Sequence, residues 1–190
     1  MGEKKHRKHI IWGITGTGYV LDECIDLMRE LEEDPEIDLT VILTKEGAAV
    51  VKWYKKWLTL TEAVQKVKVE KTPNIPFYAG PLQIGKYDMF LVCPVSANSV
   101  AKIVQGIADT LITNCVAQAI KGGMIVHIFP SDQDLEPITT KRPDGSPLVL
   151  KIRDIELENI KKLKNMEGII VIPEFSKVKE IIYRKLKEEI

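Results

Sequence analysis

Residues 89–99 are Met-Phe-Leu-Val-Cys-Pro-Val-Ser-Ala-Asn-Ser, and this stretch decides how the rest of the chain is arranged. Residues 89–93 form an apolar run of strand length that ends at Pro94. Ser96 and Asn98 then begin a helical pattern, so the stretch predicts a buried strand, a sharp turn and a helix N-terminus. Such a turn can hold a polar ligand, because helix N–H groups attract anions. The alternative is that Ser96 and Asn98 only cap the helix.

Strands and helices alternate on both sides of this stretch. Apolar runs predict strands at residues 9–15, 39–43, 89–93, 124–128 and 168–172. Helical spacing predicts helices at residues 20–33, 47–57, 61–67, 96–105, 109–120, 154–163 and 175–188. Strands that are apolar throughout belong to parallel sheets covered on both faces. We therefore expect one α/β domain over residues 1–190, a three-layer αβα sandwich of Rossmann or flavodoxin type with a mainly parallel sheet.

Three segments interrupt this alternation. Residues 1–8 are basic and predict a flexible leader. Residues 71–85 contain three prolines and two glycines, which predicts an irregular connection. Residues 129–141 predict a polar loop, and residues 142–147 carry a strong turn signal. Long irregular segments of compact domains are often functional.

Composition argues against several classes of function. Lys plus Arg and Asp plus Glu are both 27 in 190 residues, so the charge gives no reason to expect a nucleic-acid partner. No apolar run approaches the roughly 18 residues of a membrane span, and we expect a cytoplasmic protein with no membrane contact. Cys24, Cys93 and Cys115 are far apart and lack C-x-x-C spacing, so we expect neither a disulfide framework nor a metal site.

The strand-to-helix turns are the candidate ligand sites, because open α/β sheets bind ligands beyond the carboxyl ends of their strands. The turn Gly16-Thr17-Gly18 lets the backbone approach a ligand closely, but Leu21 stands where a dinucleotide fingerprint has its third glycine. Thr44-Lys45 follows the second strand, where an NAD site usually has an acidic residue. These turns disfavour NAD and are compatible with a mononucleotide. Ordinary packing or solvated turns are the alternative.

The turn after the third predicted strand carries a family resemblance. Residues 94–99, continued by Gly106-Ile107-Ala108-Asp109 and Leu111, resemble the flavin-binding signature of the homo-oligomeric flavin-containing cysteine decarboxylase superfamily, P-A-S-A-N-T followed by a helix and G-x-x-D-N-L. In such proteins the glycine turn and the Ser/Asn turn hold the phosphate and ribityl chain of FMN. A hydroxyl residue at the end of the second strand lies near the flavin ring. The resemblance implies FMN contacts at Gly16, Thr17, Gly18, Thr44, Ser96, Ala97, Asn98 and Ser99. Asn114 stands where prenyltransferase members have an arginine, which implies a weakened or replaced contact.

Two activities of this superfamily lose support at residues 129–136. Cysteine decarboxylases carry P-x-M-N-x-x-M-W there, whereas residues 129–134 of this chain are Phe-Pro-Ser-Asp-Gln-Asp. Prenyltransferase members bind a prenyl phosphate with basic residues, whereas residues 131–136 are acidic. The chain is more similar to a smaller branch, the archaeoflavoproteins and their dihydromethanopterin reductase relatives. That similarity lies at residues 12–16, 143–145, 149–159 and 166–169.

This branch implies an FMN-dependent oxidoreductase. Archaeoflavoproteins are thought to take electrons from ferredoxin and pass them to an iron–sulfur flavoprotein, so the resemblance implies these two partners and a homo-oligomer that is a trimer or a multiple of one. Because the flavin carries the chemistry, no side chain is named as a catalytic acid or base. One alternative is a pterin reductase with a pocket formed by Phe77, Tyr78 and residues 129–134. Others are a prenyltransferase or decarboxylase-like enzyme and a non-catalytic flavin-binding subunit.

Two tryptophans suggest a docking surface. Trp53 and Trp57 are four residues apart within the helix predicted at 47–57, which places them on one face beside Lys52 and Lys56. Ferredoxins are usually acidic, so a basic, aromatic face suits them. The alternative is that the tryptophans pack against another subunit or the flavin pocket while the lysines are solvated.

Overall fold

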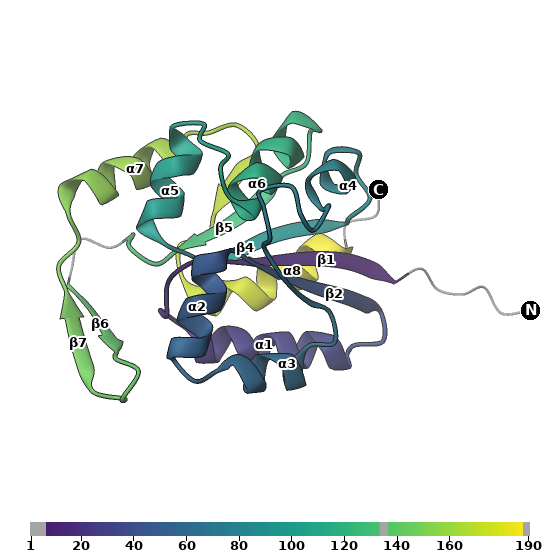
Figure 1. Ribbon diagram of the computed structural model, residues 1–190. Coiled ribbons are helices and arrows are strands. Elements are labelled where there is room, and N and C mark those ends of the chain that lie inside the picture. The colour runs from purple at the N-terminus through teal and green to yellow at the C-terminus, as the bar shows by residue number, and fades with distance from the viewer. Residues whose placement is uncertain (1–6, 134–136, 188–190) are drawn as a thin grey trace, which may run out of the picture.

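The computed structural model describes residues 7–133 and 137–187, and a sheet of six parallel strands forms its centre (Figure 1). The strands are β1 (Lys8–Ile14), β2 (Ile37–Leu43), β3 (Val67–Val69), β4 (Met89–Val95), β5 (Val126–Pro130) and β8 (Ile169–Val171). Their order across the sheet is β3-β2-β1-β4-β5-β8. The chain winds outward from β1 to β3 and then crosses to the other side of β1. The winding therefore reverses between β1 and β4, which is where open α/β sheets bind ligands.

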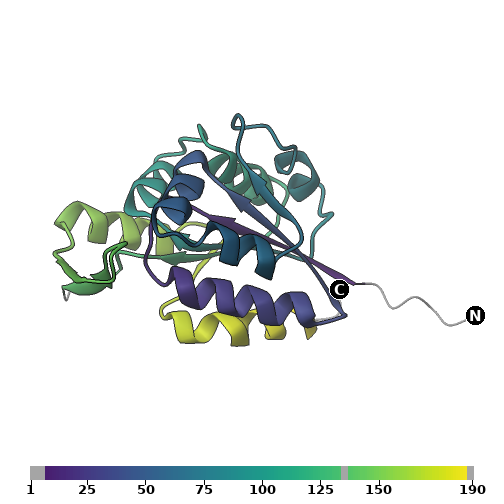
Figure 2. The same ribbon diagram turned by 60° about the horizontal axis from the view of Figure 1, so that its bottom comes forward.

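Helices cover both faces of the sheet (Figures 1 and 2). One face carries α1 (Leu21–Glu33), α2 (Lys45–Trp53), α3 (Trp57–Ala63) and α8 (Val178–Lys187), which follows a short 3₁₀ turn, η1 (Phe175–Lys177). The other face carries α4 (Ala79–Gln83), α5 (Ala97–Val104), α6 (Leu111–Lys121) and α7 (Asp154–Lys164). The expected three-layer αβα sandwich with a parallel sheet is confirmed.

Each face of the sheet has its own apolar core. Successive strand residues point to opposite faces. Trp12 and Leu91 accordingly enter the core under α1 and α8, while Ile11 and Phe90 enter the core under α5 and α6. Because both faces are buried, the central strands need apolar side chains at nearly every position. This requirement explains why apolar runs without alternation predicted the strands correctly.

The segment between β2 and β4 differs from the sequence prediction. A single helix is predicted over residues 47–57, but α2 ends at Trp53 and α3 begins at Trp57. Lys55 lies between them with a φ of 59°, a left-handed conformation that a continuous α-helix cannot include. The helix predicted at residues 61–67 is also wrong, because α3 ends at Ala63 and β3 forms at the sheet edge.

The polar loop predicted at residues 129–141 is only partly a loop. Pro130 still belongs to β5, and β6 (Ile138–Lys141) pairs antiparallel with β7 (Pro147–Leu150). The turn predicted at residues 142–147 connects these two strands. The hairpin stands apart from the main sheet and projects at the end where β1 and β4 finish (Figure 1).

The chain ends are described only in part. Lys8, which the prediction placed in the basic leader, is the first residue of β1 and pairs with Ile37. Residues 1–6, 134–136 and 188–190 lie outside the described residues. Among the residues that the structure describes, no helix is long and apolar enough to span a membrane.

Candidate functional site

A cleft of about 450 Å³ lies at the carboxyl ends of four neighbouring strands. One wall residue follows each of β1, β2, β3 and β4, and these are Gly16, Thr44, Glu70 and Ser96. The other lining residues are Lys45, Glu46 and Val50 of α2, Asn98, Ser99 and Lys102 of α5, and Asp109 and Thr110 before α6. The cleft therefore spans the point where the winding of the sheet reverses.

The turn after β1 is tied to the turn after β4. Thr15 Oγ1 accepts a hydrogen bond from the Ser96 backbone N at 2.7 Å, and the Thr15 backbone N donates to Pro94 O at 3.3 Å. Thr15 is buried, so these bonds form away from water. At the neighbouring Gly16, an added Cβ would lie 3.1 Å from the Cβ of Glu46, which favours glycine where α2 passes. These contacts hold both turns on the cleft wall.

Helix α2 begins at the cleft with Thr44 as its N-cap. Thr44 Oγ1 accepts a hydrogen bond from Gly47 N at 2.9 Å, and the Thr44 backbone N donates to Ile14 O at 3.1 Å. A hydroxyl at this position satisfies one of the free N–H groups of the first turn. Thr44 thus orients α2 so that Lys45 and Glu46 line the cleft.

Helix α5 begins at the same cleft. Ser96 Oγ accepts a hydrogen bond from Ser99 N at 3.4 Å and donates to Ser99 Oγ at 3.2 Å, so Ser96 caps the helix as the simpler interpretation of its sequence proposes. Ser96, Asn98 and Ser99 also line the cleft, and Ala97 is the first residue of the helix. Two helix N-termini therefore border one cleft, an arrangement that favours anions.

Charged groups of both signs line the cleft. Lys102 Nζ contacts the two carboxylate oxygens of Asp109, each at 2.9 Å. Lys45 and Glu46 are exposed on the first turn of α2, whereas Glu70 is only 7% exposed. The cleft can therefore accept a ligand that has both an anionic group and hydrogen-bond donors.

Glu70 is one of the cleft residues that the sequence reasoning missed, together with Glu46, Val50, Lys102 and Thr110. Its backbone N donates to Leu43 O at 2.9 Å, which continues the pairing of β3 with β2. The available signal was an acidic residue placed directly after a short run of valines at positions 67 and 69. The helix predicted at residues 61–67 concealed that strand end.

Asn114 does not line the cleft and lies one helical turn beyond Thr110, which does. It is buried in α6, and its Nδ2 donates to Pro73 O at 3.0 Å and to Asn74 Oδ1 at 2.8 Å. These bonds fasten the irregular segment that follows Glu70 onto α6. The side chain therefore has a structural role that does not require a ligand.

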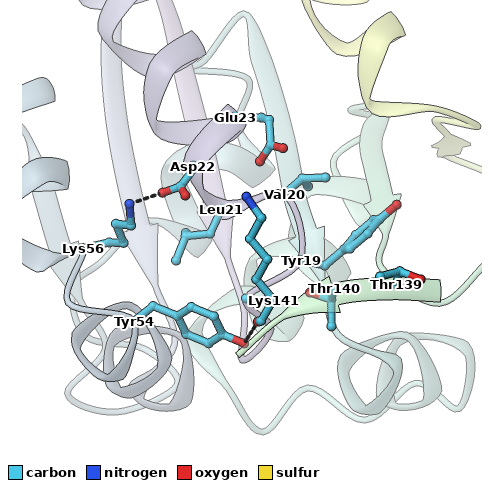
Figure 3. A pocket seen from close by; sticks show the side chains of 11 residues that line it. Tyr19, Val20, Leu21, Asp22, Glu23, Tyr54, Lys56, Thr139, Thr140 and Lys141 are labelled. Carbon is cyan, nitrogen blue, oxygen red and sulfur yellow. Dashed lines mark hydrogen bonds and ion pairs between the residues drawn. The ribbon is translucent and has the colours of Figure 1, made fainter. Parts of the chain in front are cut away.

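Gly18 lines a smaller pocket of about 150 Å³ between the start of α1 and the β6–β7 hairpin (Figure 3). Lys56 pairs there with Asp22 at 2.6 Å, and the Tyr54 hydroxyl donates to Lys141 O at 2.9 Å (Figure 3). An added Cβ on Gly18 would lie 2.5 Å from Tyr54 Cζ. The close approach at this glycine is thus made by a tyrosine ring of the protein itself.

Thr17 lines a further pocket of about 100 Å³ together with Gly18, Ser131 and Asp132. Of the predicted contacts, the structure brings Gly16, Thr44, Ser96, Asn98 and Ser99 together in one cleft. It places Thr17 and Gly18 in the neighbouring pockets.

The two tryptophans do not share a helical face. Trp53 ends α2 and is 66% exposed, whereas Trp57 begins α3 and is partly buried. Lys52 Nζ lies 5.0 Å from the centroid of the Trp57 ring, and Lys56 forms the ion pair with Asp22. The basic, aromatic surface is therefore smaller than the sequence predicted, because both of its lysines, Lys52 and Lys56, are engaged within the subunit.

The aromatic residues of the expected pterin pocket are divided between the two faces of the sheet, because Phe129 is buried in the core under α1 and α8 while Tyr78 packs against the core under α5 and α6. Phe77 is 75% exposed, and Tyr78 packs against Tyr87 with ring centroids 6.3 Å apart. Ser131 Oγ donates to Val95 O at 3.2 Å at the end of β5. Asp134, the last residue of that expected pocket, lies outside the described residues.

Two of the buried thiols, Cys24 and Cys115, are poor candidates for a nucleophile. Cys24 Sγ and Cys93 Sγ lie 3.6 Å apart in the core. Burial raises the pKa of the Cys24 thiol well above its ordinary value, and the contact with Cys93 raises it further. Burial also raises the pKa of Cys115 to about 12. Since the thiolate is the reactive form, these two groups are unreactive near neutral pH. Among the described residues, no cluster of three or more metal-ligating side chains occurs.

Known proteins with similar sequences include archaeal ones. An uncharacterised protein of Methanocaldococcus jannaschii is 43% identical over 178 residues, which are 94% of this chain and 96% of that protein. Two proteins named dihydromethanopterin reductase (acceptor), from M. jannaschii and Methanosarcina mazei, are 37% and 32% identical over 70% and 66% of this chain. The chain spans only 57% and 55% of the length of those two reductases.

Solved structures share the fold. The structure of Burkholderia xenovorans DmrB in complex with FMN, described as a cubic protein cage for redox transfer, has a TM-score of 0.79 and 27% identity, with 97% of each chain covered. A dodecameric FMN-dependent UbiX-like decarboxylase from Escherichia coli O157:H7 has a TM-score of 0.62 and 19% identity, covers 94% of this chain and 90% of its own, and shows likeness of fold alone. The family model named Flavoprotein matches residues 1–187. Since that match takes in nearly the whole chain, this protein belongs to the Flavoprotein family.

Proposed function

We propose that this protein binds FMN in the cleft at the ends of β1 to β4 and acts as an oxidoreductase. The observation that carries the proposal is the cleft, which the first turns of α2 and α5 border. Its volume of about 450 Å³ is within the range of cofactor sites. Membership of the Flavoprotein family and the FMN bound by the DmrB relative support the same cofactor.

The groups in the cleft fit the different parts of FMN. The N-terminal N–H groups of α5 and the hydroxyl of Ser99 suit a phosphate. The carboxyl group of Glu70 does not suit a phosphate, so the ribityl chain or the ring occupies that part of the cleft. When bound, FMN supplies the electron-transfer chemistry. The residues of the chain orient it and limit the access of water.

As electron partners we propose a ferredoxin-like donor and an iron–sulfur flavoprotein acceptor. The basis is the resemblance to archaeoflavoproteins. Trp53 is exposed at the end of α2, and Lys52 keeps its charge while its Nζ lies over the Trp57 ring, so a small aromatic and basic area near α2 is available to an acidic protein.

A dihydropterin is the second candidate acceptor. The similarity to two dihydromethanopterin reductases favours it, although the chain covers little more than half of their length. In this reaction the dihydropterin accepts a hydride and a proton across a C=N bond and becomes the tetrahydropterin. Both candidates use the same FMN site and differ only in what approaches it.

Anaerobic stopped-flow spectroscopy tests both candidates. The protein is loaded with FMN, reduced with ferredoxin, and mixed with an iron–sulfur flavoprotein or with a dihydropterin. We expect ferredoxin to bleach the flavin absorbance and one acceptor to restore it within the time of catalytic turnover. The other acceptor, added at equal concentration, is the matched control.

Each outcome decides one part of the proposal. A purified protein that takes up no FMN contradicts the proposed cofactor and therefore the whole proposed function. If ferredoxin does not reduce the bound FMN, the proposed donor is wrong. A nicotinamide donor then tests the hypothesis that the protein is an oxidoreductase. Bound FMN that no donor reduces identifies a non-catalytic flavin-binding subunit.

A further inference from the structure

Glu70 has a buried carboxylate oxygen that the subunit leaves unsatisfied. The residue is 7% exposed, and its Oε2 is shielded from solvent and accepts no hydrogen bond from any described residue. Its backbone is fixed, because the Glu70 N donates to Leu43 O at 2.9 Å at the end of the sheet. A carboxyl group is thus held at the cleft wall with unused acceptor capacity.

An unsatisfied carboxylate is costly for a folded protein. Its Oε2 atom has lost its hydration and has gained no donor in exchange, whereas nearly all buried polar atoms in native proteins have a partner. Two lysines line the cleft: Lys102 is paired with Asp109 at 2.9 Å, and Lys45 makes no hydrogen bond to Glu70 Oε2. The missing donor is therefore expected from outside the subunit.

A ligand in the cleft can supply that donor. The terminal torsion of a glutamate is broad, so a small rotation turns either oxygen toward the cleft. FMN offers donors of two kinds, the N3–H group of its ring and the hydroxyls of its ribityl chain. Its phosphate offers only acceptors at neutral pH and is repelled by the carboxylate.

We propose that Glu70 is a positioning residue for the flavin, accepting a hydrogen bond from the ring N3–H group or from a ribityl hydroxyl. The inference rests on the proposed binding of FMN. Two consequences follow from the chemistry of a fixed carboxylate. It orients the flavin with the phosphate toward α5, and its negative charge opposes the negative charge that the ring gains on reduction. The flavin potential is therefore lower with Glu70 than without it.

Two substitutions separate the hydrogen bond from the charge. Glu70→Gln keeps an acceptor and removes the charge, while Glu70→Met keeps a similar length and removes both. The control is Glu62→Gln, the same change on an exposed residue of α3 outside the cleft. All variants are compared as the assembled protein, with and without FMN.

Binding and thermal stability give the first readout. Glu70→Met is expected to weaken FMN binding by about tenfold to a hundredfold, as for loss of a hydrogen bond to a charged group. The same variant is expected to raise the Tm of the FMN-free protein, because the unsatisfied carboxylate is gone. A merely structural role for Glu70 predicts the opposite, a lower Tm in both states.

The flavin potential gives the second readout. Glu70→Gln is expected to make the flavin potential more positive. Without the negative charge, the protein binds reduced FMN more tightly relative to oxidised FMN. A change of about tenfold in that ratio corresponds to about 30 mV for a two-electron couple. Glu62→Gln is expected to leave the potential unchanged, because its charge is exposed and screened.

The proposal fails if wild-type protein binds FMN and both Glu70 variants match it in affinity and potential. It also fails if the variants change only the size of the assembly in light scattering, since the missing donor then belongs to another subunit. Absence of FMN binding by the wild-type protein overturns the proposed function instead, so the two failures are distinguishable.

Discussion

Gly47 shows how a single residue positions the cleft. It lies in the first turn of α2, and its N donates to the capping hydroxyl of Thr44 at 2.9 Å. A Cβ built on Gly47 would lie 2.6 Å from the backbone O of Ile14. Only glycine lets α2 approach the end of β1 this closely, and this approach brings Lys45 and Glu46 to the cleft.

We predict that Gly47→Ala lowers the free energy of unfolding by about 1–3 kcal/mol, the usual cost of forcing an extra carbon into a packed site. It should also weaken FMN binding, because α2 must move away from β1. Urea denaturation and flavin fluorescence measure the two effects. Gly80→Ala is the matched control, since nothing lies within 4 Å of its added Cβ. A Gly47→Ala protein as stable as the Gly80→Ala protein contradicts the prediction.

At the scale of elements, α6 acts as an anchor for the segment that leaves β3. Thr110 and Thr113 form a capping box at its start, with Thr113 N donating to Thr110 Oγ1 at 3.2 Å. One turn further, Asn114 binds Pro73 and Asn74. The helix thereby fixes the first part of a connection that the sequence predicts to be irregular and that contains a Thr72–Ile75 bridge and the short helix α4.

We predict that Asn114→Ala lowers the free energy of unfolding by about 1–3 kcal/mol, because the carbonyl of Pro73 loses its donor. FMN affinity should change much less than stability does, since the amide is already committed to the protein. Equilibrium denaturation and a flavin titration test this. Gln118→Ala, a partly buried residue of the same helix, is the control. Loss of FMN affinity at unchanged stability would instead support the direct contact suggested by the sequence.

The short elements were the hardest to predict. β3 has 3 residues and β6 and β7 have 4 each, so too few positions show a period. The connecting turn at residues 142–147 was nevertheless recognisable, because Pro, Asp and Gly favour turns through their own backbone preferences. Whether its flanks pair is decided by the contacts between them, as in the bond from Arg142 N to Ser146 O at 2.8 Å.

At the scale of the whole molecule, the subunit exposes several large apolar side chains. Phe77 is 75% exposed and Ile84 is 67% exposed, and Asn114 holds the segment that leads to them. Exposed apolar groups of this size often mark interfaces. We therefore expect the segment between Glu70 and β4 to contact another subunit in the homo-oligomer that the sequence resemblance implies.

We predict that Phe77→Ser shifts the protein toward smaller species and weakens FMN binding, because the segment follows a wall residue of the cleft directly. Light scattering coupled to size-exclusion chromatography measures the first effect, and a flavin titration measures the second. Leu58→Ser is the control, since Leu58 is 66% exposed on α3, which covers the other face of the sheet. An assembly that responds to Leu58→Ser and not to Phe77→Ser would place the interface on that other face.

The sequence by itself determined the sandwich and identified three of the turns that border the cleft. Buried parallel strands need continuous apolar runs, and the turns after β1, β2 and β4 carry Gly16, Thr44 and Ser96 in a recognisable pattern. Those features are local, so they can be read from neighbouring residues. They were sufficient for the fold class and for the Flavoprotein family.

Only the tertiary structure decided which of the predicted residues meet. In the folded chain Gly18 packs closely against the Tyr54 ring, and Asn114 hydrogen-bonds to Pro73. Glu70 lines the cleft. Each of these contacts joins residues far apart in the chain, through the crossing order of the strands and the packing of helices on them. Local periodicity holds no information about such pairings, which is why the unsatisfied carboxylate of Glu70 becomes visible only in the folded molecule.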